Sequence, residues 1–173
     1  ALKGQHLVFA VSARALMPYL ADAVPGWLQA ALTLYDAQGK ELAFNDDFRF
    51  NPDPVLHYEV SADGEYVLEI KDAIYRGRED FVYRIAMGEL PYVTSVFPLG
   101  GRSGASHTIE ATGWNLPSQK LVFDAKKQEP GLSVLSVPGA KFASNRFSFV
   151  VDVLPEVFEK EGNNSPKDAQ SLK

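Results

Sequence analysis

Short runs of β-branched and aromatic residues, separated by turn residues, are the feature that most restricts the fold of this chain. Between positions 32 and 87 these runs recur with turn sequences between them, at residues 31–35, 55–60, 65–70 and 81–87. Alternation of apolar and polar residues in such runs is typical of antiparallel strands with one buried face. The sequence therefore predicts an antiparallel meander over this stretch, and it contains no long helical pattern.

The residues before this stretch predict one further strand and a short helical element. Residues 7–11 form a strand pattern in which Leu7, Phe9 and Val11 share one face. A short helical turn is expected after it, from Ala13, Ala15, Leu16 and Leu20. Trp27 is expected to pack against the sheet.

The second half of the chain predicts another small sandwich. Residues 88–91 have the composition of a linker, and strand patterns follow at 92–97, 107–112, 120–123, 132–135 and 146–153. Turn signals about every eight to twelve residues are typical of a β-sandwich. We therefore expect an all-β protein with two β-sandwich domains, at residues 1–88 and 92–155. Residues 156–173 are polar without apolar periodicity, which predicts a linker that is mobile on its own.

Composition excludes several classes of function. The 173 residues carry a net charge of −5 with acids and bases interspersed, which excludes a basic nucleic-acid surface. No run of eighteen apolar residues is present, so we expect no membrane span. The absence of cysteine excludes disulfides and cysteine catalysis. Because the chain begins with Ala1, we expect it to be a piece of a longer protein.

Nucleophile and zinc patterns are incomplete. Gly101-Arg-Ser-Gly104 lacks the further glycine of a hydrolase nucleophile elbow, since Ala105 stands there, and no strand-to-helix turn is predicted. Residues 101–104 are therefore expected to form a hairpin loop, and Ser103 is not expected to be a nucleophile. His6, His57 and His107 lie far apart in the sequence and lack zinc-ligand spacing.

A polar loop supplies the best metal candidate. Asp46, Asp47 and Asp53, together with Asp36, offer the carboxylate oxygens that calcium prefers on a flexible loop. Calcium is therefore the candidate cofactor. The alternative is a solvated loop, because aspartate and asparagine are common turn residues.

Aromatic residues supply the second candidate site. Most tyrosines and phenylalanines fall at core positions of strands, whereas Phe48, Phe50 and Tyr75 fall in loops. An exposed cluster of these three could bind a sugar or a protein.

Residues 4–87 resemble the bacterial pre-peptidase C-terminal domain. The resemblance depends on Gly4, Leu32-Thr-Leu-Tyr-Asp36 with Gly39, Gly64-Glu-Tyr-Val-Leu-Glu-Ile70, Gly77 and Tyr83-Arg-Ile85. It implies a jelly-roll-like sandwich. Compared with that family, an acidic opening segment and one strand are missing before Gly4.

Residues 92–154 resemble an immunoglobulin-like domain of the IPT/TIG type. This resemblance depends on Val93-Thr-Ser-Val-Phe-Pro98, Gly101, Gly104, Thr108-Ile-Glu-Ala-Thr-Gly113 and Asn115-Leu116. The pattern Glu-x-Glu-x-Asn-Asn at 159–164 resembles the calcium-binding linker of collagen-binding relatives and the start of a further pre-peptidase domain. Docking of this tail on a neighbouring chain is one hypothesis, and simple disorder is the other.

These resemblances imply a non-catalytic accessory module of an exported bacterial protein, at the cell surface, outside the cell or in the periplasm. Its role would be that of a spacer or an interaction domain for a protein or matrix partner, beside neighbouring domains of the same polypeptide. Two alternatives remain open. A carbohydrate-binding module would use exposed aromatic residues to bind a polysaccharide, and a fragment of a secreted peptidase would need convergent polar groups in a pocket.

Overall fold

The computed structural model describes residues 1–16, 27–154 and 156–171. It confirms the all-β class, because nearly all of its regular structure is strand. The elements of the first half are β1 (His6–Ser12), the 3₁₀ helix η1 (Arg14–Leu16), β2 (Ala30–Asp36), β3 (Glu41–Asn45), β4 (Val55–Glu59), β5 (Tyr66–Asp72) and β6 (Arg84–Gly88). Those of the second half are β7 (Tyr92–Phe97), β8 (Gly100–Arg102), β9 (Ser106–Trp114), β10 (Lys120–Asp124), β11 (Gly131–Leu135) and β12 (Phe147–Asp152). Of the helical turn predicted after β1, η1 is described, whereas Leu20 lies outside the described residues.

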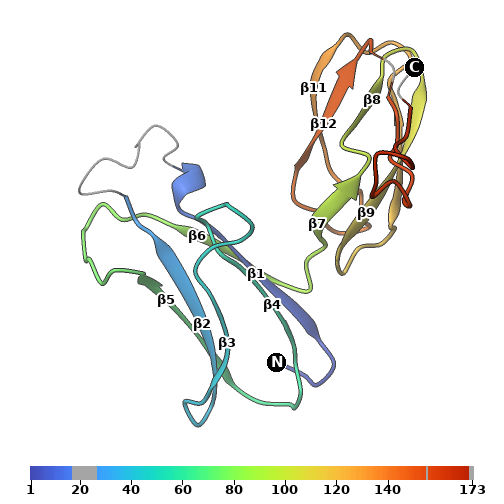
Figure 1. The fold of residues 1–173 in the computed structure, drawn as a ribbon. Helices are drawn as coiled ribbons and strands as arrows, with labels where there is room; N and C mark the ends of the chain where they lie inside the picture. Colours follow the sequence, from blue (N-terminus) through green and yellow to red (C-terminus); the bar gives the residue numbers. More distant parts are fainter. Residues whose placement is uncertain (17–26, 155, 172–173) are drawn as a thin grey trace. The chain divides into compact units, whose positions relative to one another are not determined.

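The chain divides into two compact units, residues 1–92 and residues 93–173. Strands β1 to β6 form two three-stranded sheets, and strands β7 to β12 form two more (Figure 1). Among the described residues, each sheet therefore contains only strands that precede residue 89 or only strands that follow residue 91 in the sequence.

The first unit is not the meander that its sequence rhythm predicts. Its sheets have the orders β4-β1-β6 and β3-β2-β5, and all of their pairings are antiparallel. Strand β2 is buried along both faces from Ala30 to Leu34, so it takes the centre of a sheet between β3 and β5. Strand β4 crosses to the other sheet and pairs with β1. The meander prediction is wrong, because strands that follow one another in the sequence, such as β4 and β5, lie in different sheets.

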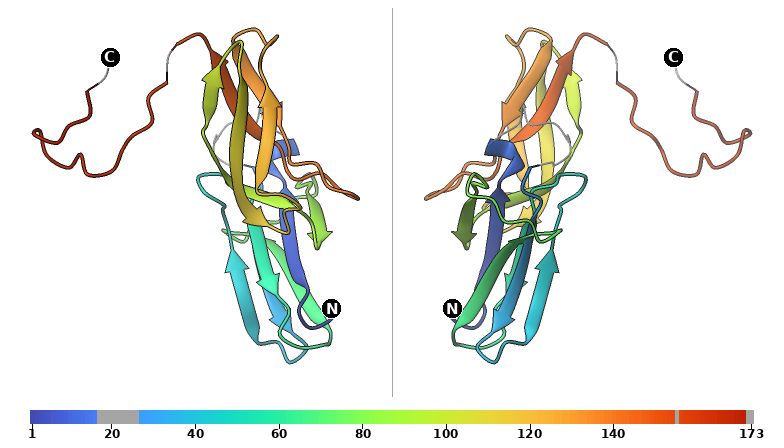
Figure 2. Two further views of the ribbon diagram at one scale, coloured as in Figure 1. Left: turned by 90° about the vertical axis from the view of Figure 1, so that its right-hand side faces the viewer. Right: turned by 90° about the vertical axis from the view of Figure 1, so that its left-hand side faces the viewer.

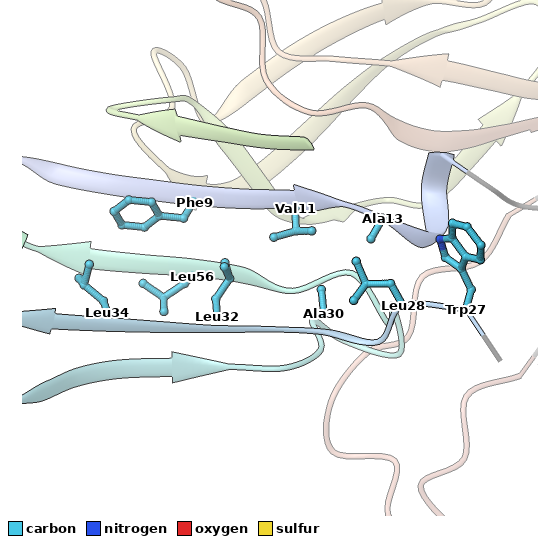
Figure 3. Packing of buried hydrophobic residues seen from close by; sticks show 9 residues of the cluster. All are labelled: Phe9, Val11, Ala13, Trp27, Leu28, Ala30, Leu32, Leu34 and Leu56. Atoms are coloured by element: carbon cyan, nitrogen blue, oxygen red, sulfur yellow. The ribbon is translucent and has the colours of Figure 1, made fainter. Parts of the chain in front are cut away.

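A core of aliphatic and aromatic side chains fills the space between these sheets. Its buried members are Phe9, Val11, Ala13, Trp27, Leu28, Ala30, Leu32, Leu34 and Leu56. Figure 3 shows the side chains of β1 facing those of β2 across this core. The alternation in β1 predicted this face, since Leu7 packs beside Phe9 and Val11. Trp27 is buried here, as expected.

The second unit is built around Ile109, Phe149 and Val151, which are buried between the sheets β10-β9-β7 and β11-β12-β8. Residues 100–102 form β8 and pair in parallel with β12, so the hairpin loop expected at residues 101–104 begins as a strand. Glycine allows this pairing, because a Cβ at Gly100 would overlap the carbonyl oxygen of Val150.

The C-terminal tail closes on itself. The Gln170 side chain donates from Nε2 to the Phe158 carbonyl at 3.0 Å and accepts the Lys160 amide at 2.9 Å. The Gln170 side-chain amide thus makes hydrogen bonds to two backbone groups of the tail. The Phe158 ring lies 5.5 Å from the ring of Phe97 in β7. The polar composition of the tail did not predict this closure.

Substituting Gly101 with alanine tests the close packing of the second unit. An added Cβ would overlap the His107 ring, which is held by a 2.8 Å hydrogen bond to the Arg102 carbonyl and lies against Phe149. We expect Gly101→Ala to lower the free energy of unfolding by about 1–3 kcal/mol, as overpacking does. Gly64→Ala is the control, since its Cβ would meet no atom within 4 Å. Equal stability of the two variants in denaturant titrations would contradict the packing.

Candidate binding surface at the loop end of the first unit

Antiparallel pairing brings three connections of the first unit to one end of its sheets, which we call the loop end (Figure 1). They are the described parts of the β1–β2 connection, the β3–β4 loop at 46–54 and the β5–β6 loop at 73–83. The strand ends on either side of these three connections pair with one another, which places the connections at the same end of the sheets. The paired residues are Ala10↔Val55, Ser12↔Arg84, Ala30↔Asp72 and Leu32↔Asn45. Loops grouped on a rigid sandwich are a common place for binding residues.

The β3–β4 loop contains a tight turn with unusual occupants. Phe48 and Asn51 exchange backbone hydrogen bonds of 2.8 and 3.1 Å, which close a two-residue turn over Arg49 and Phe50. Both central residues have positive φ, at 50° and 63°, as a type I′ turn requires. Asn-Gly is the preferred pair there, and a bulky side chain costs about 1–2 kcal/mol per residue. The Phe50 side chain is nevertheless fully exposed.

Asp53 fixes this loop to the end of β1. Its buried carboxylate accepts the backbone amides of Arg14 at 2.7 Å and Ala15 at 2.9 Å, at the start of η1. The backbone amide of Asp53 donates to Asn51 Oδ1 at 3.0 Å, and this hydrogen bond connects Asp53 to the turn. Asp53 therefore acts as a cap, as an aspartate does at a helix start.

The β5–β6 loop is fixed by a buried ion pair. The Asp72 side chain is 0% exposed and meets the Arg76 guanidinium at 3.0 Å through each of its oxygens. It also accepts the backbone amides of Arg76 at 2.9 Å and Gln29 at 3.0 Å. Arg76 donates in addition to the Trp27 carbonyl at 2.7 Å. This pair ties the end of β5 to the residues that enter β2.

Two opposing effects set the pKa of Asp72. Burial of the carboxylate favours its neutral form and raises the pKa. The hydrogen bonds from the Arg76 side chain and from the amides of Arg76 and Gln29 outweigh burial and hold the pKa at about 2. The carboxylate is therefore ionised at neutral pH and contributes stability there.

Aromatic and cationic side chains hold the rest of the β5–β6 loop against Trp27. The Phe81 ring meets the Trp27 ring edge-on at 5.3 Å, and the Arg78 guanidinium lies 5.3 Å from the Phe81 centroid. Arg78 is paired with Asp80 at 2.6 Å. Phe81 belongs to this packing, and β6 begins at Arg84 and not at residue 81 as the sequence predicted.

The loop end presents two of the three aromatic residues expected to bind. Tyr75 is 82% exposed and has a positive φ of 60°, so it is a second strained and exposed aromatic residue. Phe50 is the first. Phe48 is only half-exposed, since its ring meets Tyr92 edge-on at 5.9 Å and lies under the Arg49 guanidinium at 5.6 Å. Phe50 and Tyr75 come from different loops of this end.

The aspartates proposed as calcium ligands have different surroundings. Asp36 accepts the amides of Gln38 and Lys40 in the β2–β3 turn, both at 2.9 Å. Asp46 and Asp47 are exposed, and Asp53 directs both oxygens at backbone amides. In the described part of the chain no three acidic or histidine side chains gather in an arrangement that could hold a metal. The calcium site stays a prediction.

The other candidate residues lie outside the loop end. His6 and His57 stack at 5.7 Å on neighbouring strands, and burial together with the His6 charge lowers the pKa of His57. His107 belongs to the second unit. Ser103 donates from its hydroxyl to the Gln128 carbonyl at 2.7 Å, which is a structural contact within a loop.

Comparisons with family models, curated proteins and solved structures find no match for this chain. Among the described residues no helix is long and apolar enough to cross a membrane.

The Asp72–Arg76 pair predicts a specific loss of stability in acid. Because the folded pKa of about 2 is below the ordinary aspartate value of 3.8, the contribution to stability is complete above pH 3.8 and disappears as pH falls towards 2. We expect Asp72→Asn to lower the free energy of unfolding by about 2 kcal/mol at neutral pH and by much less near pH 2.5. Asp80→Asn, in an exposed pair, should change little at either pH. A difference for Asp72→Asn that stays constant with pH in denaturant titrations would contradict this assignment.

Relief of strain predicts that Phe50→Gly stabilises the first unit. Glycine avoids the steric penalty of about 1–2 kcal/mol at positive φ, which exceeds its extra entropy cost of about 0.5–1 kcal/mol, so we expect a net gain of about 0.5–1 kcal/mol in the free energy of unfolding. Phe142→Gly, at an exposed position without positive φ, should lower stability instead. Thermal unfolding followed by calorimetry separates the two cases. A loss of stability in Phe50→Gly would show that the turn is not strained.

Proposed function

We propose that this chain is a non-catalytic interaction module of a multidomain exported bacterial protein. The first unit would be a pre-peptidase C-terminal domain and the second an IPT/TIG-like domain, as the sequence resemblances imply. The surface that meets a protein or matrix partner would be the loop end of the first unit. The observation that supports this proposal most directly is the strained turn that holds Phe50 fully exposed.

The energetics of that turn argue for a role in binding. A bulky residue in the left-handed region persists only where the surroundings hold it, and such residues concentrate at functional sites. Here the surroundings are the Asp53 cap behind the turn and the Asp72–Arg76 pair beneath Tyr75. An exposed phenylalanine at such a position gains little from folding, because its apolar surface stays in water. The Phe50 side chain would be removed from water when a partner covers it, and this burial would favour binding.

The chemistry of the loop end suits a protein surface. Phe50 and Tyr75 are rigid aromatic groups, which dominate binding energy at protein interfaces. Ile74, Val82 and Tyr83 are also exposed in the β5–β6 loop and add apolar area to the loop end. The second unit would then serve as a spacer towards neighbouring domains.

Binding to matrix proteins tests this proposal. We expect the full chain to bind at least one of immobilised type I collagen, fibronectin or laminin, and Phe50→Ala to weaken that binding about tenfold or more. Phe142→Ala removes a phenylalanine that is 59% exposed in the second unit and should leave binding unchanged. If the wild-type chain binds none of the three proteins, or Phe50→Ala binds as well as wild type, the proposal is wrong.

A further inference from the structure

The sheet β3-β2-β5 has a second face that the core does not use. The core cluster takes Ala30, Leu32 and Leu34 from β2, so the intervening side chains point to the opposite side. We call this side the outer face. Figures 1 and 2 show its three strands side by side. Its side chains are Ala31, Thr33 and Tyr35 from β2, Glu41 and Phe44 from β3, and Val67, Glu69 and Lys71 from β5.

The centre of the outer face lies beneath larger side chains. Thr33 is 1% exposed although it points away from the core. It is paired with Phe44 on one side and with Glu69 on the other, so these neighbours cover it. Phe44 itself is 51% exposed. The outer face is therefore a platform with an aromatic ring on one edge strand and polar groups on the other, about 10 Å apart across the sheet.

The polar groups of the platform are connected to one another. Tyr35 donates from its hydroxyl to Glu69 Oε2 at 3.2 Å, and Lys71 Nζ meets the same oxygen at 3.1 Å. Glu69 Oε1 has no hydrogen-bond partner among the described residues, and the Glu69 side chain is partly exposed. The group thus offers one free carboxylate oxygen, one ammonium and one phenol, with no net charge.

Tyr75 extends the platform at the end of β5. Its ring lies 5.7 Å from Lys71 Nζ, which places a second exposed aromatic ring beside the polar group. Its positive φ of 60° sets this position, and the Tyr75 amide is held by the Asp72 carbonyl at 2.9 Å. The platform then has an exposed ring at two of its borders, Phe44 and Tyr75, with Tyr35, Glu69 and Lys71 between them.

We propose that the outer face binds a neutral oligosaccharide. Sugars present apolar C–H faces, which stack on exposed aromatic rings, and hydroxyl groups, which need both donors and acceptors. Phe44 and Tyr75 supply the rings, Glu69 Oε1 accepts from hydroxyls, and Lys71 donates to them. The ammonium is already neutralised by Glu69, and Glu41 adds a negative charge on the same face, so the platform disfavours an anionic polysaccharide. A protein partner would need an apolar centre, whereas the centre here is polar.

This inference goes beyond the proposed function, because it concerns a different face and a different ligand class. Tyr75 is the only residue that both surfaces contain. Phe50 lies in the β3–β4 loop and is not part of the platform. The two ideas can therefore fail independently.

Calorimetric titration with defined hexasaccharides tests the platform. The probes are cellohexaose, xylohexaose, mannohexaose and chitohexaose, with a hyaluronan hexasaccharide as the anionic comparison. We expect the full chain to bind at least one neutral hexasaccharide and to bind it more tightly than the anionic one. Phe44→Ala and Glu69→Gln should each weaken that binding about tenfold, as the loss of one stacking or charged contact does.

Two control variants, which should not change sugar binding, show whether an effect is specific to the platform. Phe142→Ala removes a similarly exposed phenylalanine from the second unit and should leave sugar binding unchanged. Phe50→Ala should also leave it unchanged, even where it abolishes binding to a matrix protein. Glu69→Gln keeps the side-chain shape, so it reports on the carboxylate if Phe44→Ala fails to fold. The proposal is overturned if no neutral hexasaccharide binds, if the anionic one binds more tightly, or if Phe44→Ala and Glu69→Gln, when folded, bind like wild type.

Discussion

The buried Asp72 carboxylate is the group on which the loop end of the first unit depends. Its two oxygens accept hydrogen bonds from the Arg76 guanidinium and from the backbone amides of Arg76 and Gln29. A buried charge without such partners would strongly destabilise the fold, so these groups have to stay in place together. They belong to the end of β5, to the loop that follows it and to the segment that enters β2. One carboxylate thereby fixes segments that are distant in sequence.

This anchoring explains how the loop end tolerates strain. Arg49, Phe50 and Tyr75 all have positive φ, which in bulky residues is uncommon and unfavourable. Each lies within a few residues of a carboxylate that is saturated with backbone amides, Asp53 in one loop and Asp72 in the other. Local strain at the surface is thus offset by polar contacts beneath it. The arrangement keeps aromatic side chains in water at defined positions, as a preformed binding surface requires.

Local sequence patterns predicted most strands but not their partners. Alternation identified the buried face of β1, where Leu7, Phe9 and Val11 share one side, because residue period and burial are directly linked in a strand. It missed β3, whose end at Asn45 runs directly into the Asp-rich loop and resembles a turn. The meander prediction was wrong because strand order depends on burial. Strand β2 is buried on both of its faces and therefore lies between β3 and β5. That requirement acts between residues far apart in the chain.

The candidate site was predictable only in its exposed members. Phe50 and Tyr75 stand out as aromatic residues in loops, whereas Asp53 resembled a calcium ligand. Its amide partners, Arg14 and Ala15, lie 39 and 38 positions away in the sequence, so no local pattern indicates its role as a cap. The same holds for Asp72 and Gln29, 43 positions apart. The outer face of β3-β2-β5 was missed because β3 was missed.

We infer that Asp53 and Asp72 hold the loops of the first unit rigid. Amide hydrogen exchange measures this directly, because the amides of Arg14, Ala15, Gln29 and Arg76 donate to these two carboxylates. We expect these four amides to exchange as slowly as those of β1 and β2 at neutral pH, which would mean that they open only with the unit as a whole. Exchange at the rate of exposed loop amides, while β1 and β2 stay protected, would contradict the account.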